Sequence, residues 1–151
     1  MNVIKNLIIF GMIFSMCQIA SAKPWDIWEL REELNQRASV GQSLFCNSEV
    51  GKFSITVDNA KNIIMNGLVY NGGILGGDSW VENQLCETTL DEVLCYYGTG
   101  KWVGINLTKM YVAKADGDHV GAQGRRIVIP GTVKTSFLSG DLERISCTLP
   151  L

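Results

Sequence analysis

Residues 52–58 read KFSITVD, and their strict alternation of apolar and polar side chains decides the fold class of this chain. Phe53, Ile55 and Val57 fall on one face of an extended segment, because successive side chains of a β-strand point to opposite faces. The same two-residue period recurs in three later segments, at 102–107, 133–137 and 144–149. This pattern is typical of half-buried strands.

Further apolar segments lie between these strands, and turn-forming residues separate them. The additional strands are expected at 63–70, 80–86, 92–97, 110–115 and 126–129. The turn signals stand at 58–59, 71–73, 98–100, 116–117 and 139–141. We therefore expect a mainly β fold, an antiparallel sandwich or small barrel of about eight strands.

One segment before the strands has a different period. In 24–37, PWDIWELREELNQR, Ile27, Leu30 and Leu34 fall on one face at helical spacing, which predicts a single N-terminal amphipathic helix. We expect this helix and its linker to occupy residues 23–43, and to be separable from a β-domain at 44–151. The capping-box spacing of Thr89 and Glu92 predicts one further helical turn.

Residues 1–22 predict a cleaved secretory signal peptide. Lys5 supplies the positive charge, and an apolar run and the small residues Ala20-Ser21-Ala22 follow it. The run at 7–19 is shorter than the roughly 18–20 apolar residues of a membrane-spanning helix. We expect no transmembrane segment after cleavage, and a periplasmic or secreted location.

The charge balance argues against a nucleic-acid partner. The chain has 13 basic and 15 acidic residues, and Arg125-Arg126 is its one adjacent basic pair. Nucleic acids are bound through clustered Lys and Arg that neutralise phosphates. We expect a protein or another envelope component as the partner instead.

Four cysteines remain after the signal peptide: Cys46, Cys86, Cys95 and Cys147. An even count in an exported chain predicts two disulfides, and four cysteines allow three pairings. We favour Cys46–Cys147 and Cys86–Cys95, since the first and last strands meet in closed or sandwiched β folds. A zinc site formed by all four thiolates is the alternative, although no C-x-x-C spacing is present.

Two short blocks raise the question of catalysis. Gly77-Asp78-Ser79 and the later block Asp116–His119 resemble the serine-hydrolase family named for its GDSL motif. That family has a mostly α/β fold, with Gly and Asn blocks for the oxyanion between Ser and His. Here the intervening chain has the pattern of β-strands and contains no Gly-x-Asn-Asp. We expect no enzyme, with a small hydrolase using Ser79 and His119 as the alternative.

The same histidine block also offers possible metal ligands. Asp116, Asp118 and His119 are usable ligands, but the calcium-loop pattern is incomplete and Asp-Gly also suits a hairpin turn. We expect neither a metal nor a cofactor.

Two features predict a binding surface. Tyr97 and Trp102 flank the Gly98-Thr99-Gly100 turn, where an exposed aromatic pair would suit a sugar or a peptide. Ile74 and Leu75 lie between two glycine pairs, as an apolar loop tip would. The sequence thus predicts an exported, non-catalytic binding protein, of which an inhibitor of a hydrolase or another envelope-protective factor is a specific form. A third hypothesis is an envelope assembly component that docks through the N-terminal helix.

Overall fold

The computed structural model describes residues 25–70, 77–114, 124–135 and 141–151. Within them lie one α-helix, one short 3₁₀ helix and nine strands. The elements are α1 (Ile27–Ser39), β1 (Leu44–Ser48), β2 (Gly51–Val57), β3 (Ile63–Val69), β4 (Ser79–Thr88), β5 (Glu92–Gly98), β6 (Lys101–Asn106), η1 (Leu107–Lys109), β7 (Tyr111–Lys114), β8 (Arg125–Lys134) and β9 (Glu143–Pro150). No helix in these ranges is long and apolar enough to cross a bilayer.

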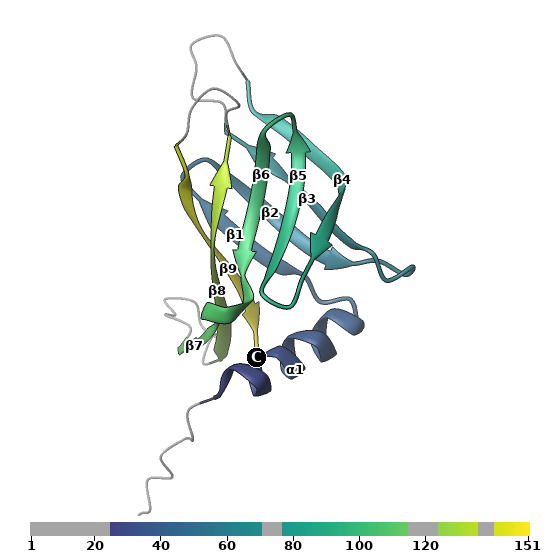
Figure 1. Ribbon diagram of the computed structural model, residues 1–151, viewed down its shortest axis with the longest axis vertical. Helices are drawn as coiled ribbons and strands as arrows, with labels where there is room; N and C mark the ends of the chain where they lie inside the picture. Colours follow the sequence, from purple (N-terminus) through teal and green to yellow (C-terminus); the bar gives the residue numbers. More distant parts are fainter. Residues whose placement is uncertain (1–24, 71–76, 115–123, 136–140) are drawn as a thin grey trace, which may run out of the picture.

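Eight of the strands form a closed antiparallel barrel (Figure 1). Strands β1 to β6 follow one another as a meander, β6 pairs with β8, β8 with β9, and β9 with β1. The expected small barrel preceded by one helix is therefore confirmed. Closure leaves few strand edges unpaired, which is how up-and-down barrels avoid edge-to-edge association.

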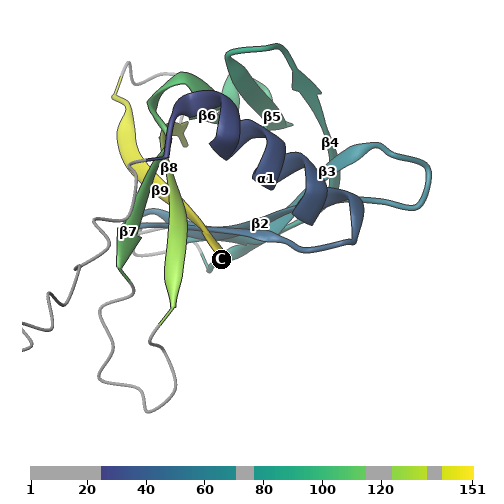
Figure 2. The same cartoon turned by 90° about the horizontal axis from the view of Figure 1, so that it is seen from below.

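Strand β7 lies outside the barrel because the chain leaves the wall at η1. β6 pairs with the second half of β8, from Gly131 to Lys134, whereas β7 pairs with its first half, from Arg125 to Val128. The β6, η1 and β7 segments thus share one partner strand. β7 and the first half of β8 form an arm that projects from the wall (Figure 2).

The expectation of separate strands at 126–129 and 133–137 is wrong, because Arg125–Lys134 is one continuous strand. Pro130 has no N–H to donate, and it lies where β8 passes from its partner β7 to its partner β6. Gly131 is required at the same place, since a Cβ there would meet the Gly104 carbonyl oxygen at 2.3 Å. Pro130 and Gly131, which resemble a strand break in the sequence, therefore lie where β8 changes its partner strand.

Apolar side chains from every barrel strand fill the interior. The largest fully buried ones from the strands are Met65, Ile105, Ile127, Ile129 and Leu149. Both favoured disulfides are confirmed. Cys46 lies directly opposite Cys147 on β1 and β9, and Cys86 lies opposite Cys95 on β4 and β5.

The predicted amphipathic helix is confirmed as α1, and it lies across one end of the barrel (Figure 2). Asp26 caps it by accepting from the Trp28 and Glu29 backbone N–H groups at 2.8 and 2.9 Å. Leu30 is 1% exposed and belongs to the barrel core, and Leu34 packs against that core. Whether the β-domain folds without the helix stays a prediction.

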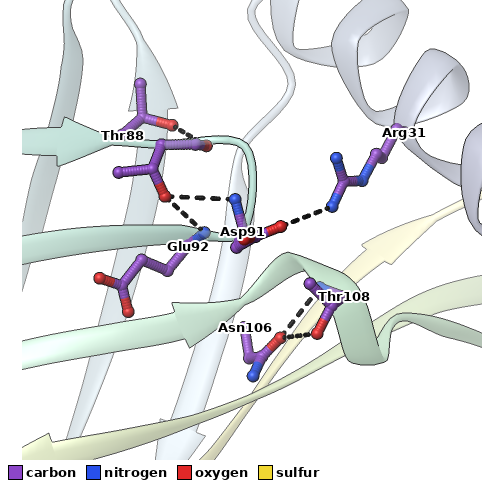
Figure 3. A network of polar contacts seen from close by, with 7 residues as sticks. Arg31, Thr88, Asp91, Glu92, Asn106 and Thr108 are labelled. Atoms are coloured by element: carbon purple, nitrogen blue, oxygen red, sulfur yellow. Dashed lines mark hydrogen bonds and ion pairs between the residues drawn. The ribbon is translucent and has the colours of Figure 1, made fainter.

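Polar contacts link the helix to the loops at this end of the barrel (Figure 3). Arg31 on α1 forms an ion pair with Asp91 at 3.4 Å, and the Leu107 N–H donates to the Asp91 carbonyl oxygen at 2.7 Å. The helical turn expected at 89–92 is wrong. The Thr89 hydroxyl instead accepts from the Asp91 and Glu92 N–H groups and forms a tight β4–β5 connection.

Candidate binding groove

Several residues singled out from the sequence lie outside the described residues. These are Ile74, Leu75 and His119, together with Asp116 and Asp118. Ser79 begins β4 and is exposed. The structure therefore gives no distance between Ser79 and His119. The binding role of Ile74 and Leu75 stays a prediction.

Tyr97 and Trp102 lie on different sides of the barrel wall. The Tyr97 ring contacts the core residue Phe53 with centroids 5.9 Å apart, and its hydroxyl donates to the Lys134 carbonyl oxygen at 2.9 Å. Burial raises the pKa of Tyr97 to about 12. Trp102 lies directly opposite Tyr96, which is 47% exposed, so the outward aromatic pair is Trp102 with Tyr96.

A groove of about 1010 Å³ lies on the outer face of the barrel, between the β7–β8 arm and strands β9, β1, β2, β3 and β4. Its described lining residues are Phe45, Cys46, Asn47, Lys52, Phe53, Ser54, Asn66, Gly67, Leu68, Trp80, Tyr111, Ala113, Lys114, Arg126, Val128, Ser146 and Thr148. Where a lining residue alternates with core residues along its strand, its side chain points outward.

The register of the strands assembles this surface from distant parts of the chain. One row of directly opposed residues crosses six strands: Tyr111, Val128, Thr148, Phe45, Ser54 and Asn66. The next row is Ser146, Asn47, Lys52, Leu68 and Trp80. Pairing of the last strand with the first therefore joins Tyr111 and Trp80 through Phe45 in one surface.

Three aromatic side chains on this surface are largely open to solvent. Phe45, Trp80 and Tyr111 are 60%, 75% and 53% exposed. The hydration of an exposed aromatic ring is unfavourable, but a single exposed ring is ordinary on a protein surface. Three in one groove are a concentration of exposed apolar surface, which is typical of an interaction site.

The charged side chains of the groove are all positive. Lys52 and Arg126 alternate with core residues and project into it, while Lys114 lines one end. None of the described lining residues is acidic. Over the part of the chain that the structure describes, these three cations make no ion pair.

The guanidinium of Arg126 is partly covered by the protein. Its Nε atom, like that of Arg31 on α1, is buried and has no hydrogen-bond partner among the described residues.

Polar contacts hold the far end of the groove in place. Asn66 on β3 accepts from the Asn83 N–H at 2.8 Å, where β4 bulges and Asn83 has a φ of 51°. The bulge follows Trp80 and Val81, which still pair with β3. Asn66 therefore fixes the strand that carries Trp80.

The sequence reasoning did not find this groove, although a signal for it was present. Phe45 adjoins the core residue Cys46, and Trp80 adjoins the core residue Val81. Each aromatic therefore has the phase of the solvent-facing positions, where an aromatic is the unexpected choice. The lining contains no histidine and no carboxylate among its described residues.

Comparison with protein-family models, with curated proteins and with solved structures found no match for this chain. The fold defines it as a closed antiparallel β-barrel with one end covered by a helix and an open groove on the outer wall.

Proposed function

We propose that this chain is an exported, non-catalytic binding protein, and that the outer groove is its binding surface for a protein or another envelope component. One observation carries the proposal. Phe45, Trp80 and Tyr111 are exposed in the same groove as the cations Lys52 and Arg126, which form no ion pair with a described residue. Aromatic residues and arginine are the residue types that dominate binding energy at protein interfaces.

The interior of the barrel offers less room for a ligand. Side chains and the two disulfides occupy it, as expected for about eight strands, where the interior is just wide enough to be filled. A filled, disulfide-linked barrel makes a rigid support. A rigid surface loses little conformational entropy on binding, which suits a tight binder such as an inhibitor.

The assembly hypothesis receives less support than the groove. Ile27, Leu30 and Leu34 are the apolar stripe of α1, and all three pack against the barrel of the same chain. The helix therefore uses its apolar face within the molecule. The structure does not test the hydrolase hypothesis, because His119 lies outside the described residues.

The compartment belongs to this proposal. Two disulfides support an oxidising environment, which the periplasm and the extracellular space both provide. The signal-peptide pattern of residues 1–22 supports export.

A photocrosslinking amino acid at position 45 tests the groove in the producing cell. The matched control carries the same amino acid in place of Leu90, which is 79% exposed in the β4–β5 loop, away from the groove. We expect a defined crosslinked species at position 45 but not at position 90. The purified partner should then bind the protein, and Trp80→Ala should weaken binding while Trp28→Ala, on the exposed face of α1, should not.

Equal crosslinking at both positions would contradict the proposal. So would a partner whose affinity is the same for the protein and for its Trp80→Ala variant.

A further inference from the structure

We infer that the groove takes an extended acidic peptide segment of a partner protein, with carboxylates at two separated points and an apolar side chain between them. This inference rests on the proposed function, because it names the chemistry of the partner that the groove binds.

The positions of the two projecting cations give the length of the ligand. Arg126 on β8 and Lys52 on β2 are three strand spacings apart, and four residues apart along the strands by register. With about 4.8 Å between strands and 3.4 Å per residue, the two positions are about 20 Å apart along the surface. One small anion cannot reach both, whereas an extended peptide spans this distance with roughly six residues.

Phe45 lies between the two cations. It is directly opposite Thr148 on β9 and Ser54 on β2, in the row between those of Arg126 and Lys52. Its ring is 60% exposed and therefore accessible from above. A ligand that bridges both cations passes over this ring, where an apolar side chain would remove it from water.

Arg126 specifies the anion at one end. Its guanidinium is a planar fork, which binds carboxylates through two parallel hydrogen bonds. A carboxylate at this point would neutralise a charge that no described residue pairs with.

The exposed Phe45 side chain between the two cations favours a peptide over an anionic glycan, because a peptide can supply both carboxylates and an apolar side chain. The described lining of the groove is basic although the chain has a formal net charge of −2, so its charge favours an acidic segment.

A peptide-display selection on the immobilised, disulfide-bonded mature protein tests the inference. The random peptides need only be long enough to reach from Arg126 to Lys52. The groove variant is Lys52→Glu with Arg126→Glu. The matched control is Lys109→Glu with Arg144→Glu, which makes the same change in charge at two exposed positions that do not line the groove. Circular dichroism confirms that both variants fold.

We expect the selected peptides to carry Asp or Glu on both sides of an apolar residue. Their affinity should fall roughly tenfold or more on the groove variant and stay within about twofold on the control, and it should weaken with added salt. Selected peptides without an acidic excess, or with equal affinity for both variants, would overturn the inference.

Polygalacturonate serves as the glycan probe. If it binds the protein but not the groove variant, and no acidic peptide is selected, the groove remains a binding surface and its assignment to a peptide is wrong. If crosslinking at position 45 also gives no partner, the proposed function fails as well.

Discussion

At the scale of single residues, two side chains mark the two ends of the barrel interior. Leu30 projects from α1 into the core at the helix end and is 1% exposed. Tyr97 lies near the other end, beside the β5–β6 turn, with its ring against Phe53 and its hydroxyl on the Lys134 carbonyl oxygen. Each makes a prediction that a single substitution can test.

Leu30→Ala should lower the free energy of unfolding by about 2–5 kcal/mol, because it leaves a cavity between the helix and the barrel. Leu90→Ala is the matched control, since Leu90 is 79% exposed and its loss should change stability by less than about 0.5 kcal/mol. Denaturant unfolding of both variants measures the difference. Similar midpoints for the two variants would show that the helix does not pack as described.

Stability should fall at high pH because of Tyr97. Burial raises its pKa to about 12, above that of an exposed tyrosine near 10, so the folded state retains a proton that the unfolded state releases. The stabilisation is complete below the unfolded pKa and is lost as the pH rises through about 12. Rapid ultraviolet titration should show a late ionisation step that Tyr97→Phe removes. A titration curve that Tyr97→Phe leaves without change at high pH would contradict the burial of Tyr97.

At the scale of elements, the helix and the arm have different parts in the molecule. The helix covers one end of the barrel and contributes Leu30 to its core, and Arg37 donates to the Pro150 carbonyl oxygen at 2.8 Å. The arm forms one wall of the groove through Tyr111 and Val128. The helix therefore contributes to stability, and the arm contributes to the binding surface.

Removal of residues 23–39 should leave a β-domain with the circular dichroism of strands but a lower melting temperature. The loss follows from the burial of Ile27, Leu30 and Leu34, at roughly 1.5–3 kcal/mol for each fully buried side chain. Both disulfides lie after this segment and should keep the barrel closed. An insoluble or unfolded truncation would show that no domain boundary exists at residues 38–43.

The two-residue alternation of KFSITVD and its counterparts could predict the β fold, and the helical spacing in residues 24–37 could predict the helix, since period is a local property of the sequence. It could not predict the arm. Pro130 and Gly131 look like a break when taken alone, and only the change of partner from β7 to β6 makes them part of one strand. The groove was missed for a related reason, because Phe45, Trp80 and Tyr111 come together only through strand register.

At the scale of the whole molecule, the two disulfides should contribute unequally. Cys46–Cys147 joins residues 101 apart and links the first strand to the last, whereas Cys86–Cys95 joins residues 9 apart within one hairpin. The chain-entropy model gives about 5 kcal/mol for the first and about 2–3 kcal/mol for the second. Replacement of Cys46 and Cys147 by alanine should therefore lower the free energy of unfolding more than replacement of Cys86 and Cys95. A larger loss at Cys86 and Cys95 would contradict this order.

Charge is unevenly distributed over the molecule, because a weakly acidic chain carries a basic groove. Its formal net charge is −2, yet the described lining of the groove has three cations and no acidic residue. Charge of one sign within a groove steers an oppositely charged partner toward it.

The claim that the outer groove is the binding surface is tested most directly by one pair of affinities. Arg126→Glu and Arg144→Glu make the same change in charge on the neighbouring strands β8 and β9, and Arg126 but not Arg144 lines the groove. Calorimetric titration of each variant with the partner that was identified by crosslinking at position 45 measures the two affinities. The predicted result is roughly tenfold or greater weakening for Arg126→Glu and an affinity within about twofold of wild type for Arg144→Glu. Equal affinities for the two variants would contradict the assignment of binding to this groove.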